Sequence, residues 1–170
     1  MTRIFKHALS RIAAIAVLAL AALAPQFAVA QSLSDYVENK IVDVILRGQT
    51  FTAPATVNIG LSTAACSDSS VGTEVTGGSY ARVAVTSSLA NWAGTQGAGT
   101  TVASSGTGGA TSNNAVITFA TPSAGWGLVT HYFAHDGTNL LFCAALTTAK
   151  TINSGDTVSF AIGSLTLTVQ

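Results

Sequence analysis

The chain has 170 residues, of which 48% are hydrophobic and only 8% are charged, and its seven basic residues are balanced by seven acidic ones. Without an excess of Lys and Arg, the chain lacks the electrostatic signature of a nucleic-acid-binding protein. Serine, threonine, asparagine and glycine replace charged residues as the source of solubility. This composition is typical of β-rich proteins that act outside the cytosol rather than of cytosolic enzymes.

Residues 1–30 have the features of a signal peptide. Residues 1–11 carry three basic side chains and no acidic one, and residues 12–23 form an apolar run that is too short to span a bilayer comfortably. Small side chains at Ala28 and Ala30 suit signal peptidase, so we predict cleavage between Ala30 and Gln31. The chain is then exported to the periplasm, cell surface or medium and contacts a membrane only through the signal. An uncleaved anchor is the alternative.

Residues 31–170 are long enough for a single domain with a core. This segment holds four basic and seven acidic residues, a net charge of −3. We expect one β-rich structural domain over 31–170.

The domain begins with a helical pattern. Residues 32–47 carry apolar side chains three or four positions apart, the period of one helical face: Leu33, Val37, Ile41, Val44 and Ile45. Ser34 suits an N-cap, and Gly48 follows where the helix should end. We predict one N-terminal amphipathic helix over 32–47. We favour packing on its own domain, and packing against neighbouring subunits is the alternative.

From Phe51 onward, apolar and polar residues alternate, as in half-buried strands. The segments with this pattern are "TVNIGLST", "YARVAVTS", "NAVITFA", "GLVTHYFAH", "LLFCAALT" and "TVSFAIGSLTLTV". "HDGTN" and "NSGD" suit hairpin turns. Six or seven short strands with one helix predict a mainly β fold, an antiparallel β-sandwich or jelly-roll-like domain. Residues 94–114, rich in Gly, Ser and Thr, are expected to form a flexible exposed loop.

The two cysteines of this domain, Cys66 and Cys143, lie far apart in the sequence. An export signal places them where disulfides persist, although two buried thiols fit the sequence equally well. If they pair, the closed loop is long and the chain-entropy model gives a stabilisation of about 4–5 kcal/mol.

Candidate chemistry is sparse. His131 and His135 share one strand face with Asp136 nearby, but four residues of strand separate the two rings by about 13 Å, too far for one metal ion without a bend. No Gly-x-Ser-x-Gly motif exposes a nucleophile. We therefore predict no catalytic residue, metal or cofactor.

Trp92 and Trp126 each stand beside a small residue or glycine and have two possible roles. They can stack on a sugar, with the 94–114 loop completing the contact surface, or close the ends of the core, which we favour.

Five landmarks follow one another between Ser32 and Val169: the opening helix, "TFTAPATVNIGLST", "GGSYARV", "WGLVTHYFAHD" and "LTTAKTINSGDTVSFAIGSLTLT". With these landmarks, the chain resembles a family of tailed-phage virion proteins of tail-fibre or head-decoration type. The resemblance implies a small, β-rich, non-enzymatic virion component. We expect this component to associate with itself and with other virion proteins. The resemblance implies no catalytic residues.

Three features depart from the family pattern: the export signal, Cys66 after "LSTA", and Cys143 directly after "NLLF". We favour a tail-fibre or capsid-decoration protein. The alternatives are an exported bacterial surface or filament subunit derived from such a module, and a glycan-binding module.

Overall fold

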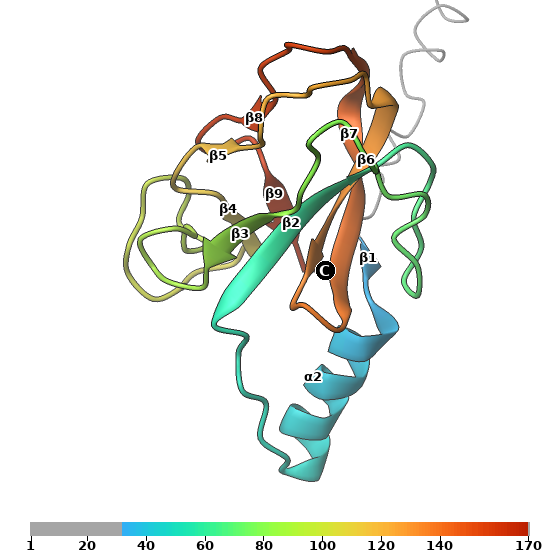
Figure 1. Cartoon of the computed structure of the whole chain (residues 1–170). Helices are drawn as coiled ribbons and strands as arrows, with labels where there is room; N and C mark the ends of the chain where they lie inside the picture. The colour runs from blue at the N-terminus through green and yellow to red at the C-terminus, as the bar shows by residue number, and fades with distance from the viewer. Residues whose placement is uncertain (1–31, 170) are drawn as a thin grey trace, which may run out of the picture.

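The computed structural model describes residues 32–169 as a mainly β fold with antiparallel sheets and one helix near the N-terminal end (Figure 1). This confirms the predicted fold class. The predicted signal peptide and its cleavage site between Ala30 and Gln31 lie outside the described residues.

The described residues form one helix and nine strands. The helix is α2 (Asp35–Arg47). The strands are β1 (Ser32–Leu33), β2 (Thr56–Ser62), β3 (Val83–Thr86), β4 (Ala110–Ser112), β5 (Ile117–Thr118), β6 (Gly127–His135), β7 (Leu140–Ile152), β8 (Ser159–Phe160) and β9 (Thr166–Thr168).

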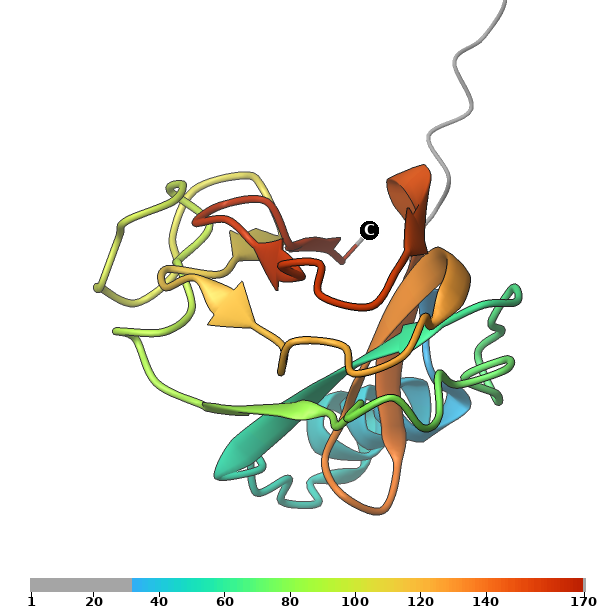
Figure 2. The ribbon, with the colours of Figure 1, turned by 45° about the horizontal axis from the view of Figure 1, so that its top comes forward.

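The strands form one large sheet and two small ones. The large sheet has the order β1-β7-β6-β2-β3, and the small sheets are the antiparallel pairs β4-β9 and β5-β8. Figure 2 shows the small sheets on one side of the large sheet. The finer expectation of a β-sandwich or jelly roll is not confirmed by this combination of one five-stranded sheet and two short pairs.

The main core lies between the large sheet and the small ones. In β2 every second side chain points into it, as the alternating pattern predicts, and these are Val57, Ile59 and Leu61. Neighbouring strands add aromatic rings, since Tyr132 of β6 packs edge-on against Phe142 of β7 and Phe160 of β8. Tyr132 also donates its hydroxyl to the Thr166 carbonyl at 2.8 Å, and burial raises its pKa to about 12.

On the opposite face of the large sheet, Phe133 is also shielded from solvent. This ring is 0% exposed and lies against Gly60 of β2, where a Cβ would overlap it. The Arg82 guanidinium lies over this ring, 5.0 Å from its centroid, and also binds the Glu74 carboxylate. Phe133 therefore requires both a glycine on the neighbouring strand and the Arg82 side chain above it.

Glu74 and Arg82 form a bidentate ion pair. Arg82 Nε donates to Glu74 Oε1 at 2.8 Å and Nη2 donates to Oε2 at 2.7 Å. The Tyr80 hydroxyl donates to Glu74 at 3.1 Å and accepts the Leu61 amide at 2.8 Å. Burial alone raises the pKa of Glu74, but the hydrogen bonds and charge of Arg82 and the Tyr80 hydroxyl outweigh it and lower that pKa.

A disulfide joins Cys66 to Cys143, with Cα atoms 6.3 Å apart. It ties the loop after β2 to β7, at the residue that pairs with Ser32 of β1. The loop after β2, the start of the described chain and β7 are therefore held together at one place.

Strand β7 carries a large bulge. Between the pairs Val129–Lys150 and His131–Ala145, residues 146–149 of β7 lie opposite the single residue Thr130 of β6. Bulges of this kind bend a strand and increase its local twist.

Three sequence expectations need correction. The helix begins at Asp35 rather than residue 32, because residues 32–33 pair with β7 as β1. The 94–114 segment is not irregular throughout, since it contains β4 and is cross-linked by hydrogen bonds such as Thr95 Oγ1 to the Ser105 carbonyl at 2.7 Å. The "NSGD" turn joins β7 to β8, which lie in different sheets and do not form a hairpin.

Removing the disulfide should destabilise the domain strongly. The bond closes a loop spanning 77 residues, so the double variant Cys66→Ser, Cys143→Ala should lose about 4 kcal/mol of unfolding free energy. Urea denaturation with and without dithiothreitol measures the loss. Dithiothreitol should weaken the wild type and leave the double variant unchanged, and equal stability of the two proteins under oxidising conditions would contradict the prediction.

The Glu74–Arg82 pair should make stability depend on acidity. Because the pKa of Glu74 is lowered in the folded state, its contribution is fully present above the ordinary value of 4.5 and is lost as the pH falls through the lowered pKa. At pH 7, Glu74→Gln should cost about 1–2 kcal/mol, since solvent reaches the pair. Urea denaturation of both proteins between pH 7 and 3 should show the difference shrinking on acidification. A constant difference would argue against the ion pair as its source.

Candidate assembly surface

Helix α2 has the two cap residues that the sequence predicts. The Ser34 hydroxyl accepts the Val37 amide at 3.3 Å, and Gly48 has φ 65°, a left-handed conformation that suits glycine at a helix end. Arg47 and Asp43, one turn apart, form an ion pair at 3.0 Å.

The N-terminal end of α2 is fixed to the β-domain by backbone groups. The Ser34 amide donates to the Leu141 carbonyl at 3.0 Å, and its hydroxyl donates to the Leu140 carbonyl, both on β7. The Asp35 amide donates to the Asp68 carbonyl at 3.1 Å, two residues from the disulfide at Cys66. The helix therefore leaves the sheet in a direction set by β7 and the disulfide loop.

Beyond this anchor the helix is exposed. None of its residues is buried, although its sequence is amphipathic. Ile45 and Leu46 are 71% and 77% exposed. Ile41, Val42 and Val44 are exposed as well. Figure 1 shows α2 projecting beyond the end of the large sheet, and the chain returns to β2 alongside it. Val37 of the apolar stripe packs against the core, and the apolar side chains beyond it are exposed to solvent.

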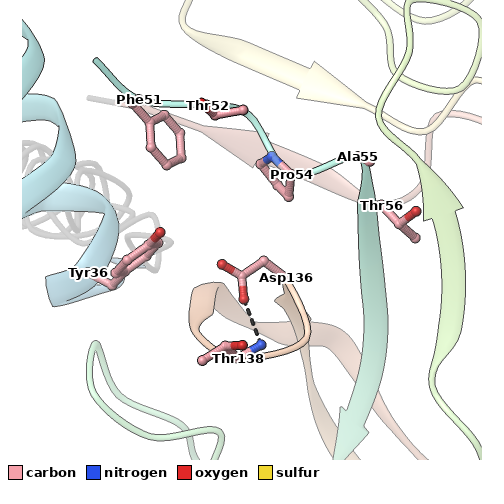
Figure 3. A pocket seen from close by; sticks show the side chains of 8 residues that line it. All are labelled: Tyr36, Phe51, Thr52, Pro54, Ala55, Thr56, Asp136 and Thr138. Carbon is pink, nitrogen blue, oxygen red and sulfur yellow. Dashed lines mark hydrogen bonds between the residues drawn. The ribbon is translucent and has the colours of Figure 1, made fainter. Parts of the chain in front are cut away.

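A cavity separates the helix from the β6–β7 turn (Figure 3). It has a volume of about 400 Å³ and is lined by Tyr36, Phe51, Thr52, Pro54, Ala55, Thr56, Asp136 and Thr138. Tyr36 meets Phe51 edge-on, with ring centroids 6.5 Å apart. This aromatic contact, rather than the apolar stripe, joins the helix to the returning chain.

The carboxylate in this cavity belongs to a well-ordered turn. Asp136 Oδ1 accepts the amides of Thr138 at 2.7 Å and Asn139 at 2.6 Å, and the Asn139 side chain donates to Oδ2 at 3.0 Å. Burial alone raises the pKa of Asp136, but the hydrogen bonds from Asn139 and Thr138 outweigh it and lower that pKa. The group is therefore an anion that closes the predicted "HDGTN" hairpin.

The two tryptophans considered as glycan contacts lie in or beside the core. Trp126 is 6% exposed, packs edge-on against Tyr80, and donates its indole N–H to the Gly78 carbonyl at 3.0 Å. Trp92 is half-buried against the core, and its residue pairs with Asn113 in an isolated bridge. Their positions favour the core-closing role, and the glycan contact has no support from the geometry.

His131 and His135 lie on β6 opposite Ser62 and Asn58, on the same face as Phe133. His135 Nδ1 accepts the Gly137 amide at 3.0 Å, and burial together with the charge of Arg82 lowers its pKa, so the ring is neutral at pH 7. Within residues 32–169 no group of three or more His, Cys, Asp or Glu side chains is arranged to hold a metal ion.

Sequence reasoning predicted the amphipathic helix but placed its start three residues too early. It favoured packing of the apolar stripe on the same domain, and within α2 only Val37 of that stripe packs against the core. The amphipathic period shows that one face is apolar, yet it does not show whether that face meets the same chain or another one. Residues 41–46 include only one polar residue, Asp43. This excess of apolar residues was the sequence feature that could have indicated an exposed apolar surface.

The Ser34 cap should control the order of the helix. Ser34→Ala removes the hydroxyl that caps α2 and binds β7, so it should cost about 1 kcal/mol and speed amide hydrogen exchange within 35–47. Urea denaturation and hydrogen-exchange mass spectrometry measure the two effects. Ser69→Ala, at an exposed loop position, is the matched control. Unchanged exchange in α2 would show that the cap does not hold the helix.

In the part of the chain that the structure describes, no helix is long and apolar enough to cross a membrane. A search of curated proteins finds no match. A comparison with protein families matches residues 32–168 to a family described as Podophage GP4 fiber I protein gp80. The match spans α2 and all nine described strands, and it confirms the resemblance to phage tail-fibre-type proteins. The chain therefore belongs to this family of phage fibre proteins.

Proposed function

We propose that the chain is a non-enzymatic structural subunit of a phage tail fibre, which associates with copies of itself and with other virion proteins. The observation that carries this proposal is the family match over 32–168, which includes the whole described β-domain and its exposed helix. Decoration of the capsid is the alternative place for the same subunit within the particle.

Self-association has a physical reason. Apolar side chains cluster on the exposed helix, and water contact with such a cluster is unfavourable. A fibre places many copies of one chain together, so contact between copies removes this surface from water.

We further propose that the chain folds after export, in an oxidising compartment. The Cys66–Cys143 disulfide favours this route, because disulfides are rare in reducing cytosol. The same observation supports the second candidate function, an exported bacterial surface or filament subunit derived from a fibre module.

Mass spectrometry of purified particles tests the assignment. Particles, envelope and medium from one culture are searched for the peptide beginning at Gln31 and for the linked Cys66–Cys143 pair. The processed, linked chain should be abundant in particles. Its presence only on cells or in the medium would overturn the virion role and support the surface subunit. Antibody labelling of particles in electron micrographs separates tail from capsid.

A further inference from the structure

The cavity between α2 and the β6–β7 turn combines two aromatic rings with a carboxylate (Figure 3). The Tyr36 and Phe51 rings meet at an interplanar angle of 70°, so they form a corner at one side of the cavity. Pro54 adds an apolar surface from the chain that returns to β2, and Asp136 lies across from the two rings. The volume of about 400 Å³ is within the range of small-molecule pockets.

The charge of the lining favours a cation. Among the described residues that line this cavity, Asp136 is the only Asp, Glu, Lys, Arg or His. Its hydrogen bonds from Asn139 and Thr138 keep its pKa low, so the carboxylate is an anion at neutral pH. A ligand with a positive charge is attracted to this lining, and an anionic ligand is repelled.

One oxygen of this carboxylate has room for a further donor. Oδ1 accepts two backbone amides, from Thr138 and Asn139, whereas Oδ2 accepts only the Asn139 side chain, at 3.0 Å. A carboxylate offers about four acceptor positions on its two oxygens. Figure 3 shows the oxygen that does not bind Thr138 directed toward the Tyr36 and Phe51 rings. A donor placed between this oxygen and the rings can therefore bind both.

The Tyr36 ring already contacts an ammonium group of its own chain. Lys40 Nζ, one turn further along α2, lies 5.6 Å from the centroid of this ring. Lys40 is not among the described residues that line the cavity, so its contact leaves the cavity free. The Tyr36 hydroxyl is directed into the same space as the Asp136 carboxylate and adds a second acceptor oxygen (Figure 3).

We propose that this cavity binds a primary ammonium group of a small ligand, whose N–H groups donate to Asp136 Oδ2 and the Tyr36 hydroxyl while its charge lies beside the Tyr36 and Phe51 rings. A primary ammonium has three N–H donors for these oxygens, and aromatic faces attract its charge. Amino sugars and ethanolamine headgroups both carry this group. The site lies apart from the apolar stripe of α2 and does not depend on the fibre role.

Titration of the oxidised, ¹⁵N-labelled protein with ethanolamine, followed by NMR, tests the ligand class. The amides of Thr138 and Asn139 should shift with a Kd of roughly millimolar size, because solvent reaches the charges. Choline, which has no N–H on its cation, and glucose, which has no charge, should bind about tenfold more weakly. Choline or glucose binding as tightly as ethanolamine, or no shift at about 50 mM ethanolamine, would overturn the proposal.

Two further ligands identify the source of the ammonium group. Glucosamine and glycerophosphoethanolamine should both shift the same amides, since both carry a primary ammonium. Tighter binding of glucosamine would assign the site to an amino sugar, and tighter binding of glycerophosphoethanolamine would assign it to a headgroup. Failure of both to bind would overturn the site as one for either ligand class.

A variant of Asp136 tests the carboxylate. Asp136→Asn should weaken ethanolamine binding about tenfold, the effect of losing one charge-assisted hydrogen bond. Asp156→Asn is the matched control, because Asp156 also closes a turn, accepting the Asn153 amide at 2.7 Å, and does not line the cavity. Both variants change the net charge equally. Equal weakening in both would trace the effect to net charge and overturn the site.

Variants of Tyr36 test the ring separately from the turn. Tyr36→Leu removes the aromatic face and the hydroxyl and should weaken ethanolamine binding about tenfold. Tyr36→Phe keeps the face and should weaken it only about threefold. Circular dichroism and thermal unfolding verify that each variant is folded. Unchanged binding in a folded Tyr36→Leu protein, or equal losses in the two variants, would overturn the contribution of the ring.

Discussion

The fold depends on the pairing of β6 with β7. Strand β6 is buried on both faces, with Tyr132 in the main core and Phe133 under Arg82, so it cannot move without disturbing both layers. Strand β7 lies beside it and carries the attachments of the N-terminal segment: the β1 pair, the Ser34 hydrogen bonds and Cys143. The β6–β7 hairpin therefore sets the direction in which α2 leaves the sheet.

The β-domain and the helix α2 have different roles in this small chain. The β-domain is stabilised by its own core, its ion pair and its disulfide, and it uses few charged residues to do so. The helix adds little to that core and presents apolar side chains outside it. A β-domain with its own core and a separate exposed helix suit a subunit of a repeated assembly.

Local features of this fold were predictable, and long-range ones were not. The cap at Ser34, the turn after His135 and the bounds of β6 follow from short-range residue chemistry, and the structure confirms them. The ion pair of Glu74 with Arg82 over Phe133 depends on how distant strands are placed, and alternation gives the face of a residue without its neighbour. The start of the helix was placed too early because two residues of β1 share its apolar character. The exposure of the apolar stripe depends on tertiary structure. In the sequence, only the apolar composition of residues 41–46 indicated it.

The bulge in β7 affects how this chain behaves at high concentration. A straight strand at the edge of a sheet offers unpaired amides and carbonyls to any other chain, and β1 covers only the part of β7 at residues 142–143. The four residues of the bulge, 146–149, break the regular spacing of these groups further along the same edge. A passing strand cannot continue its ladder across the bulge, so uncontrolled sheet extension is blocked there. When copies of the chain lie close together, this part of the β7 edge is therefore a poor template for strand pairing.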